Sequence, residues 1–170
     1  ITARAAILAG HRVKTNEIHG MAQRGGSVIA QVRFGPAVHS PLVEQGTARV
    51  LGSLERIEAL RFCPYLAPDG LAVVSAQAII PTTVSTGQAA YPADAEARLR
   101  RVFSRLVYLD AVAEARTLGD ARAANVVVLG AMSTALQLPL LTWEQALGQS
   151  VRSEHLELNL RAFRRGRELA

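Results

Sequence analysis

Residues 71–80, Leu71-Ala-Val-Val-Ser-Ala-Gln-Ala-Ile-Ile80, form an uncharged run that is rich in valine and isoleucine. The run follows Pro68-Asp-Gly70, which is a typical turn signal. A strand that is apolar on both faces is characteristic of the centre of a parallel sheet, where helices cover both sides. We therefore expect a central buried strand over residues 71–80 and a turn at residues 68–70.

Strand and helix patterns alternate on both sides of this run. We expect strands over residues 48–54 and 107–110, a loop over 81–92, and helices over 55–62, 111–118, 124–138 and 154–167. Another helix should be capped by Asp94 and bury the stripe Leu99, Val102, Phe103 and Leu106. Thr142 and Gln145 have the spacing of a capping box for a further helix. This order predicts an α/β fold: a single three-layer domain over residues 1–170, with a mostly parallel or mixed central sheet flanked by helices.

The first 35 residues continue the alternation. Residues 1–9 have a helical pattern that ends at Gly10, residues 13–15 predict a short strand, and residues 16–26 predict a loop. Residues 27–35 predict a strand with Val28, Ala30, Val32 and Phe34 on one face and Gln31 and Arg33 on the other. Because an uncapped helix rarely opens an α/β domain, we also expect a strand and a loop to precede Ile1.

Composition restricts the classes of function. The chain has 170 residues, 49% hydrophobic and 19% charged, which indicates a folded domain rather than a disordered one. The net charge is +5, but Lys14 is the only lysine and most arginines are dispersed, so we expect no nucleic-acid partner. Residues 123–141 carry no charge, yet they include Asn125 and Pro139, so we expect a buried element there and no membrane span.

Familiar catalytic motifs are missing from the sequence. There is no phosphate loop, no Gly-x-Gly-x-x-Gly, no Gly-x-Ser-x-Gly and no His-Glu-x-x-His, and the four histidines predict no metal site. The single cysteine, Cys63, excludes an internal disulfide and an all-cysteine iron–sulfur cluster held by this chain alone. We interpret Cys63 and Trp143 as packing residues, and the low cysteine content as favouring a reducing, cytoplasmic location.

The most unusual segment is Lys14-Thr-Asn-Glu-Ile-His-Gly-Met-Ala-Gln-Arg-Gly-Gly-Ser27, in which polar residues lie among glycines just before a predicted strand. Its consecutive amides could form an anion-binding nest, with Arg24 as a charge-assisted donor. Alternatively, the segment is a connecting loop in which Arg24 pairs with Glu17. The residues alone leave both interpretations open.

The segment from Val13 to Gly35, and above all its core from Glu17 to Ser27, closely resembles the gamma-type catalytic domain of 2-oxoacid:ferredoxin oxidoreductases. Within that family it is most similar to the beta subunit of indolepyruvate ferredoxin oxidoreductases. Further matching motifs are Ser40-Pro-Leu42, Leu54-Glu-Arg-Ile-Glu-Ala-Leu-Arg61, Pro64-Tyr-Leu-x-Pro-Asp-Gly70, Asn125-Val-Val-Val-Leu-Gly130, Trp143-Glu-Gln-Ala146 and Asn159-Leu-Arg-Ala-Phe163. The family begins with a strand and a Gly-x-Gly-Gly-Gln-Gly turn, and this chain starts after them.

The resemblance implies a part in the oxidative decarboxylation of a 2-oxoacid, indolepyruvate or another arylpyruvate, to acyl-coenzyme A and CO2. It also implies thiamine diphosphate, iron–sulfur clusters, coenzyme A and ferredoxin as electron acceptor. Since the chain has neither a thiamine diphosphate motif nor enough cysteines, we expect those two cofactors on a larger partner subunit or a fused region, in a hetero-oligomer. The substrate, the acceptor and the form of the partner are not determined by the sequence.

Two sets of residues are candidates for the site, and no catalytic residue is assigned. The first would bind substrate or coenzyme A, or contact the partner subunit: Glu17, His19, Gly20, Met21, Gln23, Arg24, Gly25, Gly26 and Ser27. The second would dock a partner through the basic last helix: Arg161, Arg164 and Arg165. A purely non-catalytic binding or assembly domain is the alternative function, and it would depend on this second set.

Overall fold

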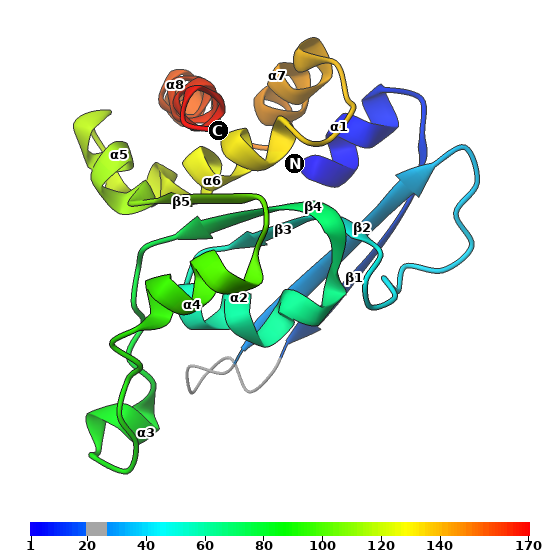
Figure 1. Cartoon of the computed structure of the whole chain (residues 1–170). Helices are drawn as coiled ribbons and strands as arrows, with labels where there is room; N and C mark the ends of the chain where they lie inside the picture. The colour runs from blue at the N-terminus through cyan, green and yellow to red at the C-terminus, as the bar shows by residue number, and fades with distance from the viewer. Residues whose placement is uncertain (20–26) are drawn as a thin grey trace.

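The computed structural model describes residues 1–19 and 27–170, and a parallel sheet lies at its centre (Figure 1). The sheet has the order β3-β4-β5, with both pairs parallel. Its strands are β3 (Ala48–Ser53), β4 (Leu66–Ser75) and β5 (Leu106–Leu109). The run at residues 71–80 thus supplies the central strand, as predicted, although the strand starts earlier and ends at Ser75.

Helices cover both faces of this sheet, so the predicted three-layer α/β fold is confirmed (Figure 1). Leu71 and Val73 of β4 belong to one apolar cluster, whereas Ala72 and Val74 belong to a second cluster on the other face. The second cluster is completed by α2 (Arg56–Phe62) and α4 (Ala95–Val102). The first is completed by α1 (Thr2–Leu8), α5 (Ala111–Thr117), α6 (Ala124–Ser133), α7 (Leu140–Gly148) and α8 (Ser153–Glu168).

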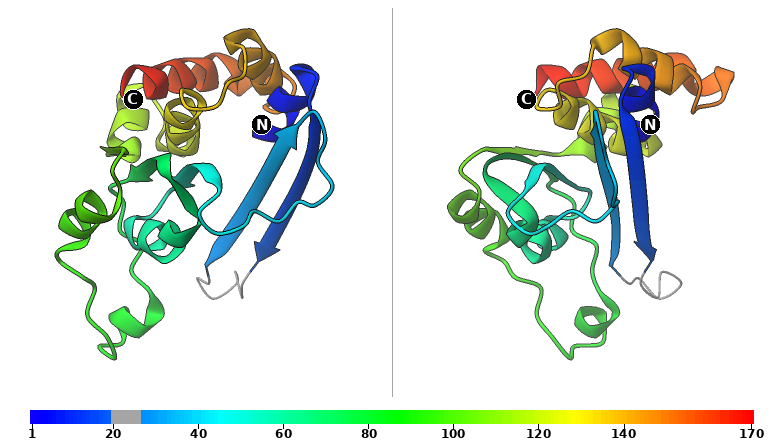
Figure 2. Two further views of the ribbon diagram at one scale, coloured as in Figure 1. Left: turned by 45° about the vertical axis from the view of Figure 1, so that its right-hand side comes forward. Right: turned by 90° about the vertical axis from the view of Figure 1, so that its right-hand side faces the viewer.

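The N-terminal strands form a separate antiparallel ribbon beside the parallel sheet (Figure 2). β1 (Arg12–His19) pairs with β2 (Val28–Gly35) from Arg12 opposite Gly35 to His19 opposite Val28. The prediction of a strand limited to residues 13–15, followed by a loop from residue 16, was therefore wrong. Residues 16–19 have weak strand patterning of their own, but pairing with β2 extends the strand through them.

The predicted faces of β2 are only partly correct. Phe34 packs against the larger apolar cluster, but Val28 and Ala30 are exposed, because only the base of the ribbon touches the helices. Gln31, which was predicted on the polar face, is buried. Its Oε1 accepts a hydrogen bond from the backbone N–H of Val43 at 3.1 Å, so the loop after β2 covers it.

One predicted turn and one predicted helix cap are absent from their expected positions. Residues 68–70 lie inside β4, where the register with β3 shifts between Ala48 and Val50, instead of forming a turn. Thr142 lies within α7, and its hydroxyl donates to the carbonyl of Pro139 at 2.8 Å, so it does not cap the helix. Proline before Leu140 already ends the preceding segment, and the helix starts one turn earlier than the capping box predicted.

The helix after Asp94 also differs from its prediction. Asp94 is at the N-cap, but its carboxylate binds Arg98 at 2.9 Å rather than a backbone N–H. Leu99 and Phe103 are buried as predicted, whereas Val102 is 49% exposed. Leu106 belongs to β5, because the chain leaves the helix at Phe103, and the stripe therefore could not continue to residue 106.

The remaining helices are short or peripheral. Two 3₁₀ turns, η2 (Cys63–Tyr65) and η3 (Ala121–Ala123), precede β4 and α6, and α3 (Thr82–Ser85) lies in the segment predicted as a loop. Trp143 is completely buried as predicted, with its ring 5.7 Å from that of Phe163. Within residues 1–19 and 27–170, no helix is long and apolar enough to cross a membrane.

Candidate functional site

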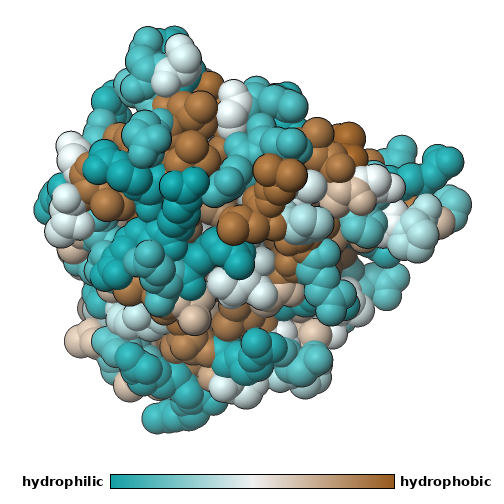
Figure 3. Space-filling view, turned by 90° about the horizontal axis from the view of Figure 1, so that it is seen from above, coloured by the Kyte–Doolittle hydropathy of each residue, from teal (hydrophilic) through white to brown (hydrophobic). Residues whose placement is uncertain are grey.

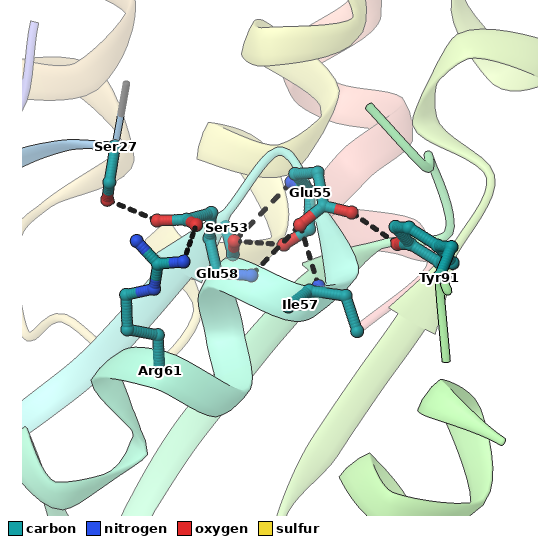
Figure 4. A network of polar contacts seen from close by, with 7 residues as sticks. All are labelled: Ser27, Ser53, Glu55, Ile57, Glu58, Arg61 and Tyr91. Carbon is teal, nitrogen blue, oxygen red and sulfur yellow. Dashed lines mark hydrogen bonds and ion pairs between the residues drawn. The ribbon is translucent and has the colours of Figure 1, made fainter. Parts of the chain in front are cut away.

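The carboxyl ends of β3 and β4 meet at one edge of the parallel sheet, and α2 starts there. Ser53 ends β3 and Ser75 ends β4, and both are buried. In open α/β sheets this edge is where ligands and partner groups usually bind. A polar network at this edge, comprising Ser27, Ser53, Glu55, Glu58, Arg61 and Tyr91, is therefore our candidate site (Figure 4).

Glu55 is the centre of this polar network, although it is only 7% exposed. Its Oε2 accepts hydrogen bonds from the backbone N–H groups of Ile57, at 2.7 Å, and Glu58, at 2.9 Å. A carboxylate at this position satisfies two of the free N–H groups of α2 and lies at the positive end of the helix dipole. Ser53 Oγ donates to the carbonyl of Glu55 at 2.5 Å, which fixes the strand–helix junction.

The second carboxylate oxygen of Glu55 holds Tyr91, which comes from the segment between α3 and α4 (Figure 4). The phenol donates to Glu55 Oε1 and accepts from Arg56 Nε at 3.0 Å, and the Arg56 guanidinium lies 4.8 Å from the ring centre. Burial, together with the bond to Glu55, raises the pKa of Tyr91. The phenol is thus the donor in its bond with Glu55 at neutral pH.

Arg56 links this part of the network to the sheet. Its pKa is raised by hydrogen bonds to Tyr91 and Tyr108, the latter on β5. Its backbone N–H donates to the carbonyl of Gln77 at 3.2 Å, just after β4. The start of α2 is therefore joined both to Tyr91 and to the segment that follows β4.

Glu58, one turn after Glu55, contacts the β1–β2 ribbon. The hydroxyl of Ser27 donates to the Glu58 carboxylate, and Arg61 pairs with the same carboxylate at 3.4 Å. Ser27 immediately precedes β2, so this bond fastens the end of the ribbon to α2. Two carboxylates at the start of one helix, three residues apart, thus hold two separate parts of the chain.

The structure describes only part of the loop that was predicted to carry the site. Glu17 is an exposed residue of β1 opposite Ala30, His19 ends β1, and Ser27 joins the polar network. The remaining candidates, Gly20, Met21, Gln23, Arg24, Gly25 and Gly26, lie outside the described residues. The anion nest and the pairing of Arg24 with Glu17 therefore stay predictions.

The central residues of the polar network had no predicted role, although Glu55, Arg56 and Glu58 lie in the matching motif at residues 54–61. Glu55 directly precedes a predicted helix, which is a usable signal for an N-cap. Tyr91 lies 36 residues further along in a segment predicted as a loop, and no local pattern connects it with Glu55. Arg56 lies in that motif, but no local pattern connects it with Tyr91 either.

The basic helix α8 uses its arginines within the fold. Arg164 donates to Glu144 of α7 at 2.8 Å and Arg165 donates to Glu114 of α5 at 2.8 Å. Arg161 donates to the carbonyl of Leu118 at 3.2 Å. A partner-docking role for these residues stays a prediction, and their contacts favour a role in holding α8 to its neighbours.

The chemistry of the donor set does not fit an iron–sulfur cluster on this chain. Cys63 is partly buried beside the smaller apolar cluster, and a single thiolate cannot supply the four ligands that a cluster needs. In the described part of the chain, no group of three or more His, Cys, Asp or Glu residues could hold a metal ion. What the site offers is a set of fixed hydrogen bonds that position two projecting segments.

Comparison with known proteins shows extensive similarity. The family model "Pyruvate ferredoxin/flavodoxin oxidoreductase" matches residues 1–169. Indolepyruvate oxidoreductase subunit IorB from Archaeoglobus fulgidus is 40% identical over 98% of this chain and 84% of its own length. The IorB subunit from Thermococcus kodakarensis is 39% identical over 95% of this chain and 83% of its own length.

Solved structures share the fold. The gamma subunit of a keto/oxoacid ferredoxin oxidoreductase from Geobacter sulfurreducens superposes with a TM-score of 0.69 and 23% identity, over 99% of this chain and 86% of that one. A 2-oxoglutarate:ferredoxin oxidoreductase from Magnetococcus marinus gives a TM-score of 0.68 and 22% identity. That match covers 99% of this chain but only 27% of the other, so the same fold also occurs as one part of a longer polypeptide.

Proposed function

Because this chain belongs to the pyruvate ferredoxin/flavodoxin oxidoreductase family, and its relatives are subunits of oxidoreductase complexes, we propose that it is the smaller subunit of an indolepyruvate:ferredoxin oxidoreductase. The complex would convert an arylpyruvate and coenzyme A to acyl-coenzyme A and CO2, passing two electrons to ferredoxin. The observation that carries this proposal is the 40% identity to an IorB subunit along nearly the whole chain.

The cofactors would be divided between subunits. Iron–sulfur clusters and thiamine diphosphate would be held by the larger partner, since this chain has one cysteine and no thiamine diphosphate motif. Thiamine diphosphate supplies the stabilised carbanion needed for decarboxylation. The smaller subunit would contribute protein groups that complete or cover the site on the partner.

The proposal is tested by co-expressing the full-length chain with a thiamine-binding subunit from the same organism. The purified complex should reduce ferredoxin when given indolepyruvate and coenzyme A, with a higher kcat/KM than for pyruvate or 2-oxoglutarate. Activity confined to the aliphatic acids would show that the substrate assignment is wrong. Failure to recover any partner that binds thiamine diphosphate would show that the assignment to such a complex is wrong.

The segment from Glu17 to Ser27 would lie at the interface with the thiamine-binding subunit. Its polar groups would help to place the carboxylate of the 2-oxoacid or a phosphate of coenzyme A. Two facts support this position: the family motif is concentrated there, and Ser27 is held by Glu58 at the carboxyl edge of the sheet. This edge is also the general ligand-binding edge of such folds.

Arg24→Ala tests the contribution of this loop in the assembled enzyme. One charge-assisted arginine contact contributes about 1.5–3 kcal/mol, so kcat/KM for the 2-oxoacid or for coenzyme A should fall roughly 10- to 150-fold. Lys14→Ala removes a cation of β1 and should leave both constants within about twofold. Unchanged constants for both substrates in Arg24→Ala would leave the loop with a packing role only.

A further inference from the structure

Residues 76–93, which we call the uncharged arm, have a composition unlike the rest of the surface. They contain no Asp, Glu, Lys, Arg or His, although at 19% charged residues a stretch of this length should hold about three. Most of the arm is exposed, including Ile79 at 56% and Ile80 at 52%. Figures 1 and 2 show it projecting from the body of the molecule around α3.

An exposed segment of this kind is unusual in a protein surface that stays in water. The cores of protein interfaces are depleted in charged residues. Two adjacent exposed isoleucines add apolar area that would be stabilised by contact with another surface. The composition of the arm is therefore that of an interface.

The arm is also held in place at both ends. Near its start, the carbonyl of Gln77 accepts from the backbone N–H of Arg56. Near its end, Tyr91 donates to the buried carboxylate of Glu55 and accepts from Arg56 Nε. Between them, Thr86 and Ser85 close α3 by donating to the carbonyl of Thr82. Because the arm is already held in position, less conformational entropy would be lost if it bound a partner.

The position of the arm indicates which molecule it would contact. Glu55 and Glu58 hold the arm and the β1–β2 ribbon to the same end of α2, and both project toward the same side of the molecule (Figures 1, 2 and 4). The free end of the ribbon exposes Ile18 and Val28. The arm therefore continues the surface that the proposed function assigns to the partner subunit.

We propose that the uncharged arm is a second contact surface for the thiamine-binding partner subunit, inserting Ile79 and Ile80 into an apolar recess without charged groups. This inference rests on the proposed function, which supplies the partner. It also makes Tyr91 and Glu55 positioning residues for the interface.

Another exposed apolar surface does not share these properties. Ile7 and Leu141 are exposed on α1 and α7, and Figure 3 shows hydrophobic side chains among polar ones on that face. α1 packs against the base of the ribbon rather than its free end, and α1 itself carries the charged Arg4. It therefore serves as a comparison rather than as the proposed interface.

The test uses the full-length chain and its purified partner subunit. The double substitution Ile79→Glu and Ile80→Glu should weaken their association about 30-fold or more, measured by biolayer interferometry. Val102→Glu, which places the same charge at a 49%-exposed apolar position on α4, should change the affinity less than about threefold. Because all three side chains are exposed, the thermal midpoints of the isolated variants should match that of the unmodified chain.

Amide hydrogen exchange of the unmodified proteins provides a measurement that needs no variant. Deuterium uptake in residues 76–91 should slow when the complex forms. Unchanged uptake overturns the inference even if the glutamate variants bind weakly, since their effect would then be indirect. Affinity of the double variant equal to that of the unmodified chain also overturns it, while leaving the proposed function intact.

Two further results would distinguish the proposed contact from self-association of the chain and from the absence of a thiamine-binding partner. A homodimer of the isolated chain in sedimentation velocity, dissociated by the double substitution that leaves partner binding unchanged, would assign the arm to a second copy and overturn the proposal. If the unmodified chain binds no thiamine-binding partner at all, the proposed function itself is wrong, and the arm cannot contact such a subunit.

Discussion

Replacing Gly130 with alanine should lower the free energy of unfolding by about 3 kcal/mol, although alanine is the better helix former. Gly130 lies on α6 against α8, and a Cβ there would lie 2.0 Å from the carbonyl oxygen of Phe163. The opposing Gly166 is equally close, since its Cβ would lie 1.9 Å from the carbonyl oxygen of Val127. Backbone atoms cannot rotate away, so the two helices would have to separate.

Gly148→Ala is the matched control. Gly148 ends α7, and a Cβ added there would meet no atom within 4 Å, so its replacement should be neutral or slightly stabilising. In thermal unfolding of the purified chain, Gly130→Ala should lower the midpoint by about 6–12 °C relative to Gly148→Ala. Equal midpoints for the two variants would contradict the close approach of α6 and α8.

Trp143→Ala should cost about 4 kcal/mol of folding free energy, by removing the largest fully buried side chain. The indole packs on Phe163 and belongs to the apolar cluster that joins α1, α6, α7 and α8 to the sheet. Its loss would leave a cavity among elements that cannot all close around it. Chemical denaturation of the isolated chain would measure the change.

Trp143→Phe separates packing from hydrogen bonding at this position. Within the described part of the chain, Nε1 of Trp143 has no hydrogen-bond acceptor, so phenylalanine removes volume without breaking such a bond. We expect a loss of about 1–2 kcal/mol. A loss as large as that of Trp143→Ala would show that the indole N–H has a role that its surroundings do not explain.

Local patterns predicted the parts of the fold that depend on burial along one segment. The apolar run at residues 71–80 predicted the central strand, and the helical pattern over residues 154–167 predicted α8. Errors occurred where an element was completed by another part of the chain. β1 extends to His19 through its pairing with β2, and Val102 is exposed because the chain turns at Phe103 into β5.

The candidate site, too, was predictable from the sequence only where it depends on consecutive residues. The family motif between Glu17 and Ser27 is a property of consecutive residues and can be recognised without a structure. The bonds from Glu55 to Tyr91 and from Glu58 to Ser27 join residues 36 and 31 positions apart. Hydrophobic periodicity in the sequence does not reveal such pairs, because they depend on the path of the chain around α2.

The sequence by itself determined the α/β class, the central strand and the family, since each follows from the order and spacing of neighbouring residues. Only the tertiary structure decided that the buried Glu55 and its neighbour Glu58 hold the uncharged arm and the ribbon on one helix. The physical reason is that hydrophobic patterning reports whether a residue is buried, whereas hydrogen-bond partners distant in sequence are selected by packing.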